Sequence, residues 1–320
     1  MLNSKNEDWE KKLLEKIATS SIREQKTARR WNVFFKFLFF IYLFSLLALY
    51  LPSDLLDDGK LSISKKHTAV IDVNGIILDG AEASADNIIS SLKKVYKAKD
   101  VEGIILRINS PGGSPVQSAY VYNEIRRLRK EHEDIPIYAV ISDIGASGGY
   151  YIAVAADKIY ANPSSMVGSV GVLMDGFGFV DTMKTLGVER RLLTAGSNKG
   201  FMDPFSPQKE NETQHMKVLL KQVHAQFIKA VKEGRGDRLK GDEDVLFSGL
   251  VWSGEEGLKL GIIDGFGSTA SIARDVVKQE KMIDYTATTD LVERLADKLG
   301  ASVGKYVFEA LGLGASIKLK

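Results

Sequence analysis

Two hydrophobic patterns alternate through the middle of the chain. Short apolar, β-branched runs bounded by polar residues occur at 68–78, 103–108 and 137–141, the pattern of strands buried on both faces. Residues 85–97 and 115–131, which lie between these runs, have apolar positions at helical spacing. Strands and helices in alternation predict an α/β domain with parallel strands.

Shorter elements follow toward the C-terminus. The pattern predicts strands at 158–161, 167–172 and 189–193, and helices at 177–186, 208–233 and 268–279. In LVWSGEEGLKLGIIDGFGS, Ser253 is placed to cap a short helix that Gly261 ends before a brief apolar strand. We divide the chain into a globular domain at 67–283 and a C-terminal helix or tail at 284–320, to which we assign no chemistry.

A much longer apolar stretch precedes the domain. Residues 31–51, WNVFFKFLFFIYLFSLLALYL, have the roughly 20 residues that a helix needs to cross a bilayer, and Lys36 is their one charged residue. They predict a single transmembrane helix. A cleaved signal peptide is the alternative, but the 30 preceding residues are too many for its charged region and no clear cleavage site follows.

Charge on either side of this stretch predicts its orientation. Segment 1–30 is rich in lysine and arginine, whereas Asp54, Asp57 and Asp58 follow the apolar stretch in the linker at 52–66. By the positive-inside rule the N-terminus faces the cytosol. In a bacterium the protein would then lie in the cytoplasmic (inner) membrane, with the globular domain on the periplasmic or extracytoplasmic side.

Composition excludes several classes of function. Lys and Arg total 43 against 41 Asp and Glu, so the charge balance does not suggest nucleic acid as a partner. The absence of cysteine excludes disulfides and a thiol nucleophile. No cluster of His, Asp and Glu has metal-ligand spacing, and we predict no metal and no cofactor.

Two glycine-rich turns carry the candidate chemistry. In DIGASGGYYIAVAA, Gly145, Ser147 and Gly149 match the pattern of a serine exposed on a tight turn at a helix N-terminus, where the amide of Gly148 can face an oxyanion. The turn NSPGG at 109–113 likewise follows a predicted strand. Ligands of parallel sheets bind at such strand ends, so the pair favours acyl transfer.

A serine nucleophile also needs a general base. The chain has four histidines, none in a catalytic-looking context: His67, His132, His215 and His224. A lysine can take this role where burial or a nearby positive charge lowers its pKa. Lys199, in the glycine-rich segment TAGSNKGFMDPF, is the candidate.

Four segments resemble the bacterial signal peptide peptidase A (protease IV) family, whose fold is ClpP/crotonase-like with repeated β-β-α units. They are INSPGG, GASGGYYIAVAADKIYANPSSMVGSVGV, TAGSNKGFMDPF and VWSGEEGLKLGIIDGFGS. The resemblance implies that Ser147 is the nucleophile, Lys199 the general base, and the amides of Gly113 and Gly148 the oxyanion hole. It also implies that Ser169 orients the lysine.

The same resemblance implies a membrane-anchored endopeptidase of the short, single-repeat form. Its substrates would be remnant signal peptides and similar apolar peptides. It would form a ring-like homo-oligomer in which a lysine can serve the serine of a neighbouring subunit. Three alternatives remain: a crotonase-type acyl-CoA enzyme, an α/β-hydrolase with His215 or His224 as base, and a membrane scaffold without activity.

Overall fold

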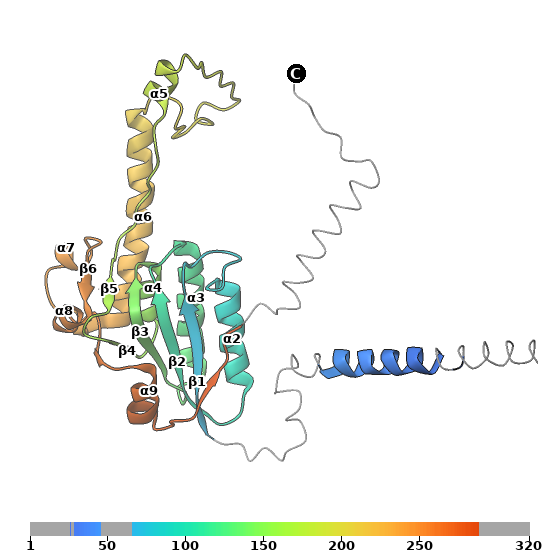
Figure 1. The fold of residues 1–320 in the computed structure, drawn as a ribbon. Coiled ribbons are helices and arrows are strands. Elements are labelled where there is room, and N and C mark those ends of the chain that lie inside the picture. The colour runs from blue at the N-terminus through green and yellow to red at the C-terminus, as the bar shows by residue number, and fades with distance from the viewer. Residues whose placement is uncertain (1–25, 27–28, 46–65, 288–320) are drawn as a thin grey trace, which may run out of the picture. The chain divides into compact units, whose positions relative to one another are not determined.

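The computed structural model describes residues 26, 29–45 and 66–287. Residues 29–45 form a helix, drawn in blue in Figure 1. Within these described ranges, no helix combines the length and the hydropathy needed to cross a membrane. The predicted span at 31–51 continues into residues 46–51, which lie outside the described residues. The predictions for segment 1–25, the rest of the linker up to residue 65 and the leucines of the C-terminal tail also fall outside them.

The domain is built on one mixed sheet, with hydrogen-bonded order β6-β5-β3-β2-β1-β8 and with β4 between β3 and β7. Its pairs are parallel except β5 with β6. The strands are β1 (His67–Asn74), β2 (Val101–Ser110), β3 (Ile137–Ala146), β4 (Lys158–Ala161), β5 (Met166–Gly168), β6 (Val251–Ser253), β7 (Gly265–Phe266) and β8 (Met282–Asp284). The predicted α/β organisation is therefore confirmed (Figure 1).

Strand β3 changes partner along its length. Its first half, from Tyr138 to Ile141, pairs with β4, and its second half, from Ile144 to Ala146, pairs with β5. The strand is accordingly longer than the predicted run at 137–141. Because its second half leaves β4 and continues beyond it, β3 delivers the next residue, Ser147, to the edge where β2 also ends.

Helices cover both faces of the sheet. On one face lie α2 (Ala85–Lys97), α3 (Pro115–Glu131), α4 (Gly148–Ala153) and the C-terminal part of α6 (Glu210–Arg235). On the other, α9 (Thr269–Ile272) and the turn that follows it pack against Ile105 and Val140. The predicted helices α2 and α3 are both confirmed with the same bounds. Each begins directly after a serine, Ser84 or Ser114, whose side chain caps the helix by accepting a backbone amide hydrogen.

The remaining helices are short. They are α5 (Val180–Thr185), α7 (Glu243–Leu246) and α8 (Gly254–Lys259). Ser253 caps α8 by accepting the amide hydrogen of Glu256, as predicted. The predicted helix at 268–279 is α9 continued by a wider turn at Ala273–Val277.

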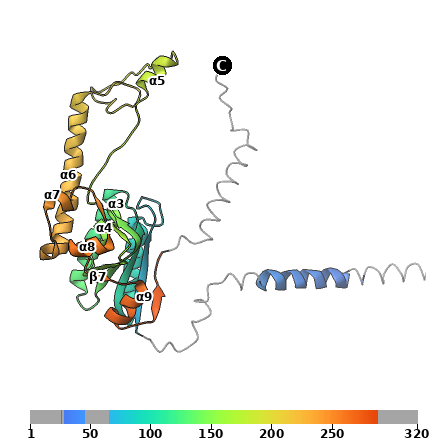
Figure 2. The ribbon, with the colours of Figure 1, turned by 60° about the vertical axis from the view of Figure 1, so that its left-hand side comes forward.

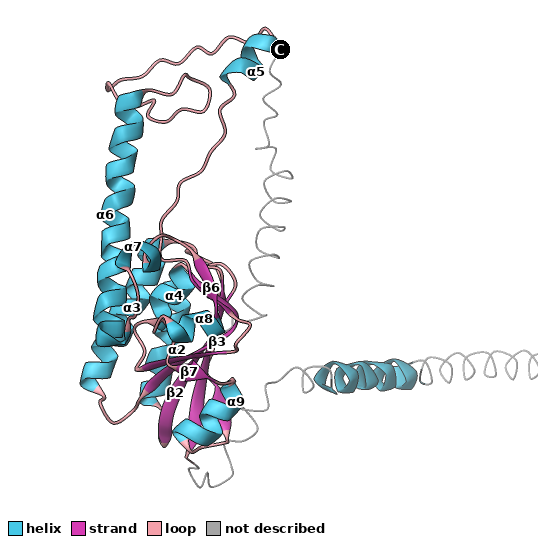
Figure 3. Ribbon diagram, turned by 90° about the vertical axis from the view of Figure 1, so that its left-hand side faces the viewer, coloured by secondary structure: helices cyan, strands magenta, loops and turns pink. Residues whose placement is uncertain are grey.

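The predicted strand at 189–193 is wrong. Those residues are irregular and exposed, and the Leu193 side chain has a relative accessibility of 96%. They belong to a segment that we call the arm, residues 172–220, which contains α5 and the N-terminal half of α6. Figures 1 and 3 show α6 continuing past the sheet, with α5 near its far end. The apolar pattern of residues 189–193 is real, but no partner strand lies beside it within the described chain.

Helix α6 supports this arm. It has 26 residues and is therefore about 39 Å long. Its buried side chains, apart from Glu212, belong to the last third, from Phe227 to Arg235. Figure 2, turned from the first view, again places α5 away from the sheet. The helix is thus anchored by its C-terminal end.

Candidate active site

Ser147 lies on a strained turn between β3 and α4. Its φ is 51° and its ψ −121°, a combination that residues other than glycine rarely adopt. Its amide donates a hydrogen bond to the carbonyl of Gly168 at 2.9 Å, and its carbonyl accepts the amide hydrogen of Tyr151 at 2.9 Å. Backbone strain of this kind gathers at functional sites, where surrounding structure holds it.

Two tyrosines of helix α4 anchor it to the rest of the domain. Tyr150 is fully buried and donates its hydroxyl hydrogen to the carbonyl of Ile262 at 2.7 Å, while burial raises the pKa of its phenol. Tyr151 stacks on Phe227 of α6, with ring centroids 4.7 Å apart. These contacts fix the helix whose first turn follows Ser147.

The NSPGG turn meets the serine turn face to face. A Cβ atom added at Gly112 would lie 2.7 Å from the Gly148 amide nitrogen and 3.0 Å from Ser147 Oγ. One added at Gly148 would lie 2.4 Å from Ser118 Oγ and 3.3 Å from the Gly113 amide nitrogen. Both positions require glycine because the two backbones approach so closely.

The two predicted oxyanion donors therefore lie beside each other at Ser147. Within residues 66–287, neither the Gly113 amide nor the Gly148 amide donates to another backbone or side-chain acceptor. Gly113 is held by its neighbours instead: Ile77 donates to the Gly112 carbonyl at 2.9 Å and accepts from the Ser114 amide at 2.7 Å. Two unused amides beside a serine hydroxyl can bind the oxyanion of an acyl-transfer intermediate.

Sequence reasoning missed one residue of this turn. Ser110 is fully buried, and its hydroxyl accepts the amide hydrogen of Gly112 at 3.1 Å. This bond shapes the turn that presents Gly113. A serine two residues before a glycine in a turn is the pattern that indicates such a bond.

Ser169 lies close to the serine turn, since it directly follows Gly168. It has a φ of 54° and donates its amide hydrogen to the carbonyl of Leu250 at 2.7 Å. Its neighbour Gly168 packs under Trp252, where a Cβ atom would lie 2.6 Å from the indole ring. The segment that carries Ser169 is therefore held by β6 and by the residue before it.

Lys199 is not brought to Ser147 within one chain. It is exposed and lies in the arm, in a turn where its own backbone amide donates a hydrogen bond to the carbonyl of Gly196. Glu212 near the start of α6 accepts the amide hydrogen of Met202, whereas the helix that follows Ser147 packs on Phe227. Positions 212 and 227 are fifteen residues apart on the helix, about 22 Å along the axis. Lys199 lies three residues before Met202 and so belongs to the loop at the opposite end of α6 from the contact with the helix that follows Ser147.

The histidines proposed as alternative bases have other contacts. His224 Nε2 lies 3.0 Å from the carbonyl oxygen of Val170, and the ring of His215 meets the edge of Phe201 at 5.7 Å. Neither of these contacts involves Ser147. The geometry thus gives no support to a Ser-His pair within the chain.

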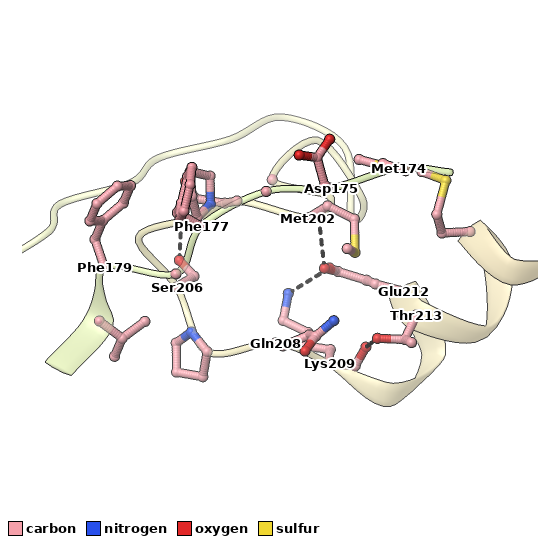
Figure 4. Close-up of a pocket in the computed structure, with 18 of the residues that line it drawn as sticks. Met174, Asp175, Phe177, Phe179, Met202, Ser206, Gln208, Lys209, Glu212 and Thr213 are labelled. Carbon is pink, nitrogen blue, oxygen red and sulfur yellow. Dashed lines mark hydrogen bonds and ion pairs between the residues drawn. The ribbon is translucent and has the colours of Figure 1, made fainter. Parts of the chain in front are cut away.

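A cavity of about 820 Å³ lies in the arm, away from the serine turn. Figure 4 shows Phe177, Phe179 and Met202 around it. Among the lining residues, Glu212 accepts hydrogen bonds from Lys209 Nζ and from the Met202 amide, both at 3.0 Å. Neither Ser147 nor Lys199 lines this cavity, so we do not assign it the catalytic chemistry. Among the described residues, no group of three or more His, Asp and Glu side chains is arranged to hold a metal ion.

Comparison with known proteins identifies the family. The model of peptidase family S49 matches residues 129–284. A protein of Enterococcus faecium named as a signal peptide peptidase SppA is 28% identical over 83% of this chain and 78% of its own length. Protease 4 of Haemophilus influenzae is 30% identical over 69% of this chain and 35% of its own length.

A further relative carries a different name. The Na⁺/H⁺ antiporter NhaA of Brucella melitensis is 44% identical over 64% of this chain, but this chain spans only 28% of the antiporter. The antiporter's name therefore describes a protein of which most has no counterpart here. The mixed α/β sheet, by contrast, fits the ClpP-like fold of peptidase family S49. The chain belongs to peptidase family S49, the family of signal peptide peptidase A and protease IV.

Proposed function

We propose that this chain is a membrane-anchored serine endopeptidase in which Ser147 is the nucleophile and Lys199 of a neighbouring copy is the general base. Its substrates would be remnant signal peptides and similar apolar peptides. The observation that carries the proposal is the meeting of two glycine turns, which leaves the amides of Gly113 and Gly148 unused beside Ser147. We also propose that the domain is built from the repeated β-β-α units of the ClpP/crotonase fold.

The residues suggest a complete hydrolytic cycle. Neutral Lys199 takes the proton of the Ser147 hydroxyl as its oxygen bonds to the peptide carbonyl carbon, and the Gly113 and Gly148 amides bind the resulting oxyanion. The C–N bond then breaks, and the lysine ammonium gives its proton to the leaving amine. Water attacks the acyl-enzyme in the same way, and the serine recovers its proton. No metal or cofactor takes part in this scheme.

The position of Lys199 supports a base supplied by a second copy. In one chain it lies at the far end of α6 from Ser147, and the arm exposes large apolar side chains, with relative accessibilities of 79% at Leu173, 79% at Phe177 and 96% at Leu193. Apolar side chains exposed together are typical of contact surfaces between proteins. A neighbouring copy that packs against the arm of the first copy would place its Ser147 beside the Lys199 of the first copy. Ser169 would then lie where it can orient the incoming amine.

Membrane anchoring is part of the proposal. It is supported by the apolar residues 31–51 and by the basic segment before them. A protein with this topology leaves its catalytic domain in the periplasm or outside the cell, next to peptides released in the bilayer. Protease added to intact spheroplasts should digest residues 67–283 and spare the N-terminus; digestion of the N-terminus instead would contradict this topology.

Activity on a peptide tests the function directly. The full chain in detergent should hydrolyse an apolar, signal-peptide-like peptide, and Ser147→Ala and Lys199→Ala should each abolish hydrolysis while keeping the parent melting temperature. A scaffold without activity predicts no cleavage by the parent. A Ser-His hydrolase predicts that Lys199→Ala cleaves normally.

A further inference from the structure

The segment after β5 makes a sharp turn beside Ser147. The carbonyl of Gly168 accepts the Ser147 amide hydrogen, and the Gly171 amide donates back to the Ser169 carbonyl at 2.9 Å. The second of these bonds closes a three-residue turn whose central residue is Val170. The side chain of Val170 is buried, with a relative accessibility of 1%. The segment that carries this turn is thus joined to Ser147 by one hydrogen bond, from the Ser147 amide to the Gly168 carbonyl.

Helix α6 contacts this turn through the side chain of His224. His224 Nε2 lies 3.0 Å from the carbonyl oxygen of Val170. Because a carbonyl oxygen only accepts, Nε2 must carry the hydrogen, and the imidazole is the donor. The carbonyl at the centre of a tight turn has few other partners, since the turn's own bond uses the carbonyl of Ser169.

The same face of α6 also contacts the other side of Ser147. One turn after His224, Phe227 stacks on Tyr151, whose amide donates to the Ser147 carbonyl. Two neighbouring positions of α6 therefore hold the turn after β5 and the helix that follows Ser147, the two segments whose backbones bond Ser147. His224 supplies the polar contact of the two, and it lies just after the point where α6 enters the domain from the arm.

We propose that His224 is a positioning residue: by donating to Val170 it holds the turn at 168–171, and with it the amide partner of Ser147 and the Ser169 side chain, in the arrangement that hydrolysis requires. This inference rests on the proposed function. It assigns His224 no proton transfer, which distinguishes it from the role of general base.

Three variants of the full chain test this role. His224→Gln places an amide donor near the position of Nε2, His224→Leu keeps the bulk and removes the donor, and His215→Leu changes an exposed histidine of the same helix. Loss of one neutral hydrogen bond should lower kcat of His224→Leu by about tenfold with KM little changed. The Gln and His215 variants should stay within about twofold of the parent. Hydrogen exchange of the amides at 168–172 should be faster in the Leu variant alone.

Each outcome decides the proposal. If Gln is as impaired as Leu, the histidine acts by its own chemistry and the proposal fails. If both retain parent kcat, or if Leu loses activity with unchanged exchange at 168–172, it also fails. Should the Leu variant not fold, His224→Asn, whose amide is too short to reach Val170, is measured in its place. A parent chain that cleaves nothing would overturn the proposed function, while the exchange measurement would still test the contact.

Discussion

Ser147 and Gly168 are joined through their backbones: the serine amide donates to the glycine carbonyl at 2.9 Å. This bond ties the end of β3 to the end of β5, two strands that pair in parallel up to Ala146 and Gly168. The nucleophile candidate is therefore held by the sheet itself, and its strained φ of 51° is supported from both sides. Changes to the glycines around it should act on catalysis through backbone position.

Gly112→Ala should reduce activity severely. The new methyl group would lie 2.7 Å from the Gly148 amide nitrogen and 3.0 Å from Ser147 Oγ, and so would displace one oxyanion donor. Loss of such a donor typically costs about a hundredfold or more in kcat. Steady-state kinetics on an apolar peptide measures the effect.

Gly265→Ala is the matched control for this change. Its methyl group would meet only the ring of Tyr160, at 3.4 Å, which is an ordinary contact. It should retain the parent kcat. Equal kcat values for the two alanine variants would contradict the oxyanion assignment.

The sequence predicted the helices and strands whose ends are marked by recognisable residues. Helix α3 begins with Ser114 as its cap and Pro115 as its first residue, a combination that is recognisable without tertiary information. Strands β6 and β8 went unpredicted because three residues are too few to show a period, and their pairing with β5 and β1 joins distant segments.

The candidate site was predictable only in its local parts. Gly113, Ser147 and Gly148 lie on turns that the glycine pattern marks, and the structure brings them together. The separation of Lys199 from Ser147 was not readable, because it depends on where α6 is anchored along its length. The apolar pattern at 189–193 was read as a strand for a related reason: a sequence shows that a residue is apolar without showing what covers it.

A double change of His215 and His224 to Gln should leave hydrolysis nearly unchanged. Gln keeps a donor for the Val170 carbonyl, and His215 contacts only the ring edge of Phe201 among the described contacts. The pH–rate profile of the double variant should match the parent. A loss of more than about a hundredfold in kcat would point to a histidine base instead.

Asp264→Asn should destabilise the fold. Arg235, whose side chain has a relative accessibility of 1%, donates to this carboxylate at 2.6 Å. Removing the acceptor charge leaves a buried guanidinium unpaired, which costs about 3–5 kcal/mol. Urea unfolding at pH 7 measures the loss. Asp275→Asn, which breaks an exposed pair with Arg274, is the control and should leave the midpoint unchanged.

The same carboxylate predicts a pH dependence. Burial alone would raise the pKa of Asp264, but hydrogen bonds and charge from Arg235, with help from the Ile159 amide and Arg238, outweigh it and lower the pKa below the ordinary 3.8. A carboxyl group with a lowered pKa contributes stability above its unfolded-state value and loses it as the pH falls through the folded-state value. The parent should therefore lose stability below about pH 3.8, and Asp264→Asn should lose less over the same interval.

Complementation between two inactive variants tests the central claim, that Ser147 and Lys199 of different copies form one site. Ser147→Ala and Lys199→Ala chains are produced together in equal amounts, so that their subunits mix at random, and are compared with each variant alone. If the base comes from a neighbour, about a quarter of the sites in the mixture pair an intact serine with an intact lysine, and about a quarter of parent activity returns. If the mixture is as inactive as the two variants, while cross-linking shows that they assemble together, the serine and its base belong to the same chain and the account is wrong.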